Sequence, residues 1–265
     1  MVDLACSLAL FACVLAIAAA YGVHVARTGY AWHARVERAG RSPLLGMGVQ
    51  QMGYWAMRPA ARACIALGWS ANAISWASLV LAAAAGTALA FGRFGVGAAL
   101  SAVSSVCDAL DGMVARETGT ASNAGEVLDA TVDRYAELFF IGGVAYAARL
   151  DPVALLLAFA AAAGAVMVSY ATAKAEALRV EAPRGVMRRQ ERAVYLVLGA
   201  ALVPIAAAAA VRWALPTWVG WAPMLAAFGL VGVLGNASAV YRLRVVADRV
   251  VLQPRHRVAR SSPAQ

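Results

Sequence analysis

The sequence predicts an all-α integral membrane protein with a six-helix transmembrane core, a juxtamembrane amphipathic helix and an extra N-terminal transmembrane helix. Apolar residues make up 62% of the 265 residues, whereas soluble globular chains carry about 45–50%. Charged residues make up 14%, against a usual share of about 25%, and the mean hydropathy is +0.69. A soluble domain has too little interior to bury so much apolar surface, so these observations indicate a membrane protein.

Seven apolar stretches approach or exceed the length of about 20 helical residues that crosses a hydrocarbon core about 30 Å thick. They are residues 4–23, 73–91, 95–115, 127–148, 153–173, 193–211 and 218–241. Turn residues such as Gly92, Asp151 and Pro216 separate them. No basic residue precedes the first stretch, so we expect a retained span and not a cleaved signal peptide. The segment 46–68 is too polar to cross and is predicted to lie on the membrane as an amphipathic helix.

The basic residues fall on one side of the predicted spans. Of the 23 Lys and Arg residues, 20 lie in the segments 24–62, 116–134, 174–192 and 242–265. The opposite turns hold the other three, Arg93, Arg149 and Arg212. The positive-inside rule therefore places the N-terminus outside and the C-terminal tail in the cytoplasm. The net charge of +9 is explained by topology, and no nucleic-acid partner is expected because aromatic residues do not interleave with the basic ones.

Two successive predicted spans carry aspartates near their cytoplasmic ends, although a carboxylate at mid-span costs about 2.5–3.5 kcal/mol. Asp108 and Asp111 are three positions apart, Asp129 and Asp133 are four apart, and each pair shares a helix face. A short turn joins the two helices, so we expect them to pack antiparallel and to bring the four carboxylates together. A cluster with only oxygen ligands suits Mg²⁺ or Mn²⁺.

Small residues and a cation accompany these acids. Gly112, Ala115 and Gly125 would let a ligand approach the backbone, and Arg116 offers a positive charge suited to phosphate. In an alternative interpretation the acids form ordinary ion pairs with Arg116 and Arg134, which explains one aspartate better than four. A cation transporter is the alternative from another class, and it would carry acids near mid-membrane in several spans.

The spacing of these residues resembles the signature of the CDP-alcohol phosphotransferase family. Residues 108–133 match every fixed position of D-x2-D-G-x2-A-R-x8-G-x3-D-x3-D. Ser70, Asn72 and Ser75 are similar to the family's N-x-x-T/S entry to the preceding span. The resemblance implies a catalytic membrane domain over residues 45–245, preceded by an extra span and cytoplasmic linker (1–44) and followed by a basic cytoplasmic tail (246–265).

The resemblance also implies an enzyme that cleaves CDP-diacylglycerol, releases CMP and transfers the phosphatidyl group to an alcohol. By motif position, the ligands of two Mg²⁺ or Mn²⁺ ions would be Asp108, Asp111, Asp129 and Asp133, with Asp133 also the catalytic base. The CDP pocket would be lined by Gly112, Ala115, Arg116 and Gly125. Such an enzyme is expected to be a homodimer in the bacterial inner membrane, with its active site on the cytoplasmic side.

The acceptor alcohol is predicted from a second similarity. Residues 169–178 and 185–192 are similar to the segments S-Y-x-x-A-[KR]-A-E-x-L and G-x-x-x-R-x-[ED]-R of bacterial phosphatidylinositol-phosphate synthases. There, the basic residues at the positions of Lys174, Arg189 and Arg192 hold the phosphate of inositol phosphate. In the alternative interpretation these residues are only a positive-inside loop. Glycerol 3-phosphate, the acceptor of phosphatidylglycerophosphate synthases, also presents a phosphate and stays an alternative.

Overall fold

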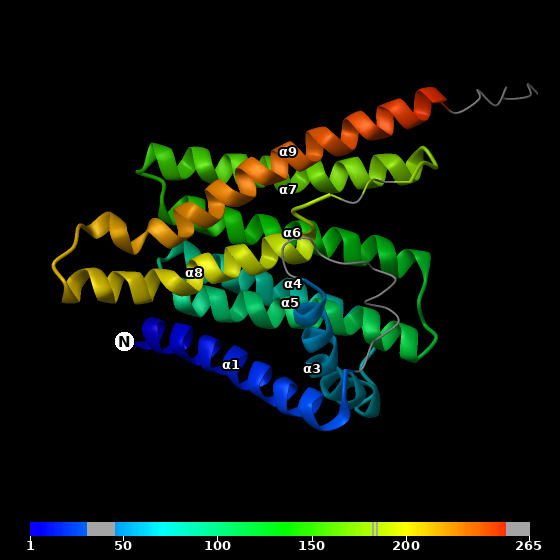
Figure 1. Ribbon diagram of the computed structural model, residues 1–265, viewed down its shortest axis with the longest axis horizontal. Helices are drawn as coiled ribbons and strands as arrows, with labels where there is room; N and C mark the ends of the chain where they lie inside the picture. The colour runs from blue at the N-terminus through cyan, green and yellow to red at the C-terminus, as the bar shows by residue number, and fades with distance from the viewer. Residues whose placement is uncertain (31–45, 182, 184, 253–265) are drawn as a thin grey trace, which may run out of the picture.

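The computed structural model describes residues 1–30, 46–181, 183 and 185–252. Within that part every regular element is a helix (Figure 1). The elements are α1 (Val2–Thr28), α3 (Gly46–Ala66), α4 (Ala71–Ala90), α5 (Phe94–Glu117), α6 (Asn123–Ala147), α7 (Pro152–Ala177), α8 (Arg189–Arg212), the 3₁₀ helix η1 (Thr217–Gly220) and α9 (Ala222–Leu252). The all-α prediction is confirmed.

Six of these helices are long and apolar enough to cross a membrane, namely α1, α4, α5, α7, α8 and α9. The chain is therefore an integral membrane protein. Helix α6, with 25 residues, is not among the six. Five charged residues lie in its first 15 positions: Glu126, Asp129, Asp133, Arg134 and Glu137. The seventh span, expected at 127–148, stays a prediction.

Short polar side chains begin several helices at the turns that the sequence indicates. Ser70 Oγ accepts a hydrogen bond from the Ala73 N–H at the start of α4, and Ser122 Oγ accepts one from the Gly125 N–H at the start of α6. Asp151 caps α7 in the same way. These bonds satisfy N–H groups that have no partner inside the helix, so each cap fixes where its helix begins.

Helix α4 lies between α5 and α6 and packs along both, whereas α5 and α6 touch each other only briefly. The expectation that α5 and α6 pack directly against each other is therefore wrong. Small residues explain the arrangement, since a Cβ added at Gly86 of α4 or at Gly143 of α6 would overlap the other helix's backbone. A second close pair, α7 and α9, lies side by side in Figure 1 and meets through Gly164 and Gly235.

Helix α9 runs to Leu252, past the predicted end of the last span at Tyr241 and through the predicted domain boundary at 245. Val246 and Val250 pack against the end of α7 and the turn after it, through Ala175 and Val180. The apolar face of the helix therefore continues into the segment that was predicted to be a tail. Residues 253–265 of that tail, and residues 31–45 of the predicted linker region, lie outside the described residues.

Candidate active site

Three of the four predicted carboxylates converge where α5 approaches the turn to α6. One oxygen from each of Asp108, Asp111 and Asp129 lies within 4.8 Å of the others. Asp108 and Asp111 are buried, with 9% and 5% of their surface exposed. Carboxylates this close repel one another unless positive charge lies among them, and a hard divalent cation accepts such a ligand set. The convergence of these three is confirmed, while their role as metal ligands stays a prediction.

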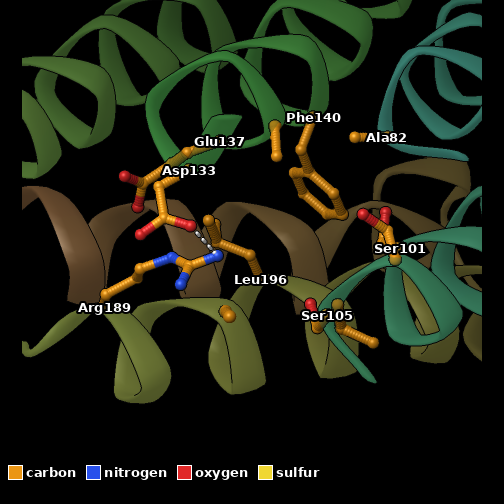
Figure 2. Close-up of a pocket in the computed structure, with 12 residues that line it drawn as sticks. Ala82, Ser101, Ser105, Asp133, Glu137, Phe140, Arg189 and Leu196 are labelled. Atoms are coloured by element: carbon orange, nitrogen blue, oxygen red, sulfur yellow. Dashed lines mark ion pairs between the residues drawn. The ribbon is translucent and has the colours of Figure 1, made fainter. Parts of the chain in front are cut away.

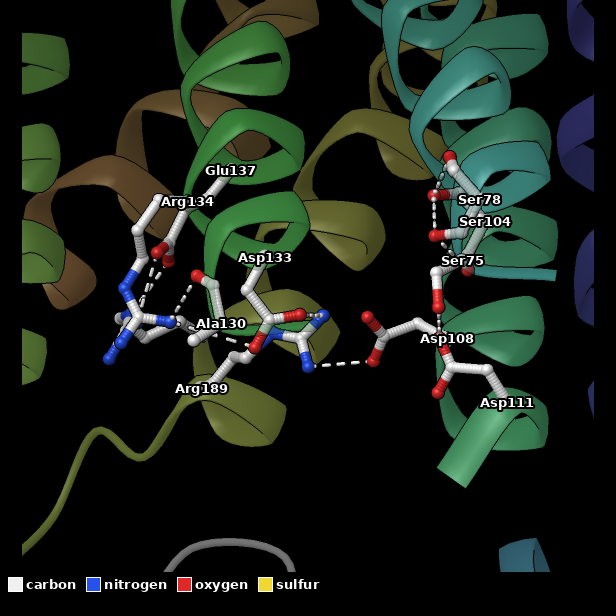
Figure 3. Close-up of polar contacts among 11 residues, drawn as sticks. Ser75, Ser78, Ser104, Asp108, Asp111, Ala130, Asp133, Arg134, Glu137 and Arg189 are labelled. Carbon is white, nitrogen blue, oxygen red and sulfur yellow. Dashed lines mark hydrogen bonds and ion pairs between the residues drawn. The ribbon is translucent and has the colours of Figure 1, made fainter. Parts of the chain in front are cut away.

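Asp133 is not one of these three, but its carboxylate lies beside that of Asp108 and against a guanidinium. Arg189, the first residue of α8, donates from Nη1 to Asp108 Oδ2 at 2.7 Å and also pairs with Asp133 (Figure 3). Arg134 makes a longer contact with Asp133, at 3.6 Å. The contact with Arg134 that the alternative interpretation predicted is therefore present, but Arg189 is the cation that joins the two aspartate-bearing helices.

A hydrogen bond from α4 holds Asp111. The Ser75 hydroxyl donates to Asp111 Oδ2 at 2.5 Å, and one turn further along α4 the Ser78 hydroxyl donates to the Ser104 carbonyl at 3.1 Å (Figure 3). A carboxylate held by a second residue keeps its orientation, so Ser75 restricts where the oxygens of Asp111 point. The sequence marked Ser75 as part of a span entry, but its spacing carries no sign of this contact.

A cavity of about 390 Å³ opens beside the acids. Its walls include Asp108, Asp111, Asp129, Gly112, Arg116 and Arg189. A Cβ built on Gly112 would lie 2.9 Å from Arg116 Nη1, which shows that the guanidinium lies over Gly112. Two residues predicted for the CDP pocket, Gly112 and Arg116, thus line the same cavity as the acids. The other two, Ala115 and Gly125, are not among its described walls.

Helices α3 and α8 supply further walls that the sequence did not predict. They are Tyr54 and Met57 of α3 and Gln190 of α8. Tyr54 and Met57 are three positions apart and so share one face of the amphipathic helix. The apolar pattern of residues 46–68 predicted a helix face that contacts lipid. Part of this face, with Tyr54 and Met57, instead covers the cavity.

The three residues predicted to bind the acceptor phosphate do not line one described cavity together. Arg189 borders the large cavity, and Lys174 is exposed in the last turn of α7. Arg192 is 1% exposed and donates from Nε and Nη2 to the Glu137 carboxylate, at 2.6 and 2.9 Å. Its Nη1 donates to the Met187 carbonyl at 2.8 Å. A direct contact of Arg192 with the acceptor stays a prediction, and this buried pairing does not favour it.

Arg242 of α9 is a buried cation that the sequence interpretation counted only as a topology signal. It is 7% exposed, and its Nη1 donates to Thr172 Oγ1 at 3.1 Å. Its Nε is buried and has no hydrogen-bond partner among the described residues. The charges of Arg188 and Arg192 lie near it. In the sequence, only the position of Arg242 directly after the apolar stretch 218–241 could have indicated that it is buried.

Behind Arg189 a smaller cavity of about 60 Å³ reaches into the helix bundle (Figure 2). Asp133 and Glu137 line it from α6, and Ser101 and Ser105 line it from α5. Arg189 borders both cavities, while Asp133 borders only the smaller one. The Arg189 side chain therefore stands between Asp133 and the space beside the other three acids.

Residues 68–232 include all the wall residues of the smaller cavity and those of the larger cavity except the ones on α3. These residues match the family model of CDP-alcohol phosphatidyltransferases. This match covers more than half of the chain. The chain belongs to this family of enzymes.

Curated relatives share about a third of their aligned residues with this chain. The bifunctional IPC transferase and DIPP synthase of Rubrobacter xylanophilus is 35% identical over 178 residues, which is 66% of this chain and 36% of that protein. The archaetidylinositol phosphate synthase of Methanothermobacter thermautotrophicus is 35% identical over 129 residues, 49% of this chain and 65% of that protein. The phosphatidylinositol phosphate synthase of Mycolicibacterium smegmatis is 32% identical over 149 residues, 55% of this chain and 67% of that protein. The matches thus span less than two thirds of the first two relatives.

Solved structures of a phosphatidylinositol phosphate synthase share the fold. The phosphatidylinositol phosphate synthase of Mycobacterium tuberculosis, in complex with manganese and citrate, superposes with a TM-score of 0.62 at 22% identity, covering 72% of this chain and 88% of that one. The same enzyme with CDP-DAG bound gives a TM-score of 0.61 at 24% identity, covering 72% and 92%. At these identities the comparison establishes the fold alone.

Proposed function

We propose that this protein transfers a phosphatidyl group from CDP-diacylglycerol to inositol phosphate and releases CMP. The observation that carries the proposal is a cavity in which Asp108, Asp111 and Asp129 converge beside Arg116 and Arg189. Carboxylates that close together can bind a divalent cation, and guanidinium groups beside them can bind phosphate. Both substrates of the proposed reaction carry phosphate.

The proposed metal ligands fit the chemistry of Mg²⁺ or Mn²⁺. All the donors are carboxylate oxygens, and the Asp108 Oδ1 atom is buried with no hydrogen-bond partner in the described chain. A polar atom buried without a hydrogen bond is rare, and a bound cation would satisfy this one. We propose that Asp108, Asp111 and Asp129 hold one ion and that Asp133 joins them in holding a second. Bound cations would neutralise the pyrophosphate and the departing CMP.

The chain's own residues have separate tasks in the proposed reaction. Arg116 binds a phosphate of the donor over Gly112, and Ala115 and Gly125 complete the CDP pocket. Asp133 accepts the proton of the acceptor hydroxyl. The hydroxyl oxygen then bonds to the β-phosphorus, and the bond from that phosphorus to the bridging oxygen breaks. CMP leaves with the electron pair of that bond.

The acceptor's phosphate is proposed to bind to Arg189, with Lys174 and Arg242 as further cations. Arg189 borders the cavity, and the buried Nε of Arg242 is a donor with no hydrogen-bond partner in the described chain. The Asp108 and Asp133 carboxylates already pair with Arg189, so a phosphate must share or displace them. Arg192 is proposed to hold the start of α8 in place, because Glu137 satisfies its donors.

We further propose that α6 is a seventh span and that the cluster faces the cytoplasm of a bacterial cell. The charges of α6 all lie in its first 15 positions, at the end that carries the cluster, and residues 138–147 hold none. The N-terminus would lie outside. Residues 45–245 would form the catalytic domain, extended by the rest of α9. The homodimer is proposed from the family alone.

Release of CMP by the purified protein tests the proposal. CDP-diacylglycerol and Mg²⁺ are supplied with inositol phosphate, free inositol or glycerol 3-phosphate. We expect turnover with inositol phosphate, loss of turnover in EDTA, and loss in Asp108→Asn and Asp129→Asn. Asp248→Asn, an exposed change on α9, is the matched control and should stay active. Faster turnover with glycerol 3-phosphate would make that compound, and not inositol phosphate, the acceptor. Absence of CMP release with every acceptor would overturn the proposed reaction.

A further inference from the structure

Helix α1 contacts the rest of the protein near its two ends and, between them, through Leu10 and Phe11, which pack against the core of the bundle. At its start, Asp3 Oδ1 accepts a hydrogen bond from the Val96 N–H at 3.0 Å, and Ser7, the buried residue of α1, lies against Gly95. Near its end, the Tyr21 and His24 rings lie 5.5 and 5.3 Å from the Trp55 ring of α3, between centroids. No residue between Ser7 and Tyr21 is fully buried, and Cys13 and Ala16 are exposed.

A groove of about 530 Å³ lies between this middle stretch and α3. Its α1 side is apolar, with Cys13, Ala16 and Ile17, and its α3 side carries Trp55, Arg58 and Arg62. The volume is within the range of about 300–1,000 Å³ that is usual for ligand sites. Cys13 to Ala20 spans about 10 Å of helix, so a flexible chain can lie along it.

The groove is basic at one side and has no acid in its walls. Arg58 and Arg62 are exposed, and neither forms an ion pair with a residue of the described chain. They are four positions apart and thus share a helix face with Trp55. Helix α3 runs across the direction of α1 (Figure 1). Its two arginines line the groove together with the apolar residues of α1. An anionic group with an apolar chain complements both walls.

The groove is separate from the active-site cavity. Tyr54 and Met57 of α3 face that cavity, whereas Trp55, Arg58 and Arg62 face α1. At about 100° per residue, these two sets are centred about 100° apart on α3 and so lie on neighbouring faces. A ligand in the groove would therefore contact the face of α3 next to the one that walls the active site.

We propose that this groove binds an anionic diacyl phospholipid other than the donor. Its phosphate lies against Arg58 and Arg62, and an acyl chain follows Cys13, Ala16 and Ile17. The proposal does not depend on the reaction proposed above.

Native mass spectrometry of the purified full chain, titrated with phosphatidylglycerol or phosphatidylcholine, tests this site. We expect the first phosphatidylglycerol to bind more tightly than phosphatidylcholine. The double change Arg58→Gln/Arg62→Gln should reduce that preference by about fivefold for each arginine. Ala16→Trp fills the groove without changing charge and should weaken the binding of both lipids.

Two control variants distinguish this groove from general charge attraction and from the donor cavity. Arg27→Gln/Arg244→Gln removes the same charge from exposed positions outside the groove and should leave the preference unchanged. An equal loss in that variant would mean general attraction to basic residues and would overturn the site, as would normal binding by Ala16→Trp. Arg116→Gln should also bind phosphatidylglycerol normally. A loss there equal to that of the Arg58/Arg62 variant would place the lipid in the donor cavity.

Discussion

The buried pair of Glu137 and Arg192 offers a sharp test of what the basic segment before α8 does. The guanidinium makes two hydrogen bonds to the carboxylate and a third to the Met187 carbonyl, and Arg192 is 1% exposed. The sequence similarity assigns Arg192 to the acceptor phosphate, whereas these contacts assign it to the joint between α6 and α8. The two interpretations predict different outcomes for the same substitutions.

Removing one member of a buried ion pair leaves the other charge without compensation, which costs about 3–5 kcal/mol. We therefore expect Arg192→Met to lower the free energy of unfolding by about that amount, with Glu137→Met somewhat less costly because the Glu137 side chain is 13% exposed. The double variant replaces both charges by apolar groups of similar length. It should recover most of the loss, since two well-packed apolar residues can replace a buried pair at little cost.

Unfolding by dodecyl sulfate in mixed micelles measures these differences, and CMP release measures activity in the same samples. Arg212→Met, in the exposed last turn of α8, is the control and should change stability by no more than about 0.5 kcal/mol. An Arg192→Met variant as stable as the parent would refute the structural role. A double variant of parental stability whose acceptor KM rises tenfold or more would restore the direct contact with phosphate.

Three further outcomes are expected. Ser75→Ala should weaken Mg²⁺ activation by about 10- to 100-fold, because its carboxylate partner loses its orientation, while Ser78→Ala should not; titration of activity with Mg²⁺ decides. Gly143→Ala should lower the free energy of unfolding by about 1–3 kcal/mol through collision with the α4 backbone, while Gly142→Ala, which meets open space, should cost little in the same unfolding assay. Arg189→Gln should reduce kcat/KM for a phosphorylated acceptor by about 10- to 150-fold and for free inositol far less, and equal losses would contradict a phosphate contact.

The sequence predicts the chemistry of the site better than the path of the chain around it. Helical periodicity places Asp108 and Asp111 on one face of α5, and the convergence of Asp129 with them agrees with what the sequence led us to expect. The position of α4 between α5 and α6 was not predicted, because helices that are adjacent in the sequence were expected to pack directly against each other. Gly86 and Gly143 allow the close approach of α4 and α6, but a small residue in an apolar stretch does not indicate which helix packs against it. The pairing of Arg192 with Glu137 is hidden for the same reason, since the partners lie 55 positions apart.

Arg189 and Arg192 are three positions apart on α8 and contact carboxylates from different helices. Arg189 reaches Asp108 of α5 and Asp133 of α6, and Arg192 reaches Glu137, one turn beyond Asp133 on α6. The α8 start thus sets the distance between two helices that barely touch each other. A shift of α8 would move the base proposed on α6 relative to the metal ligands proposed on α5. The buried pair is well placed to prevent such a shift, because separating it would leave two buried charges without compensation.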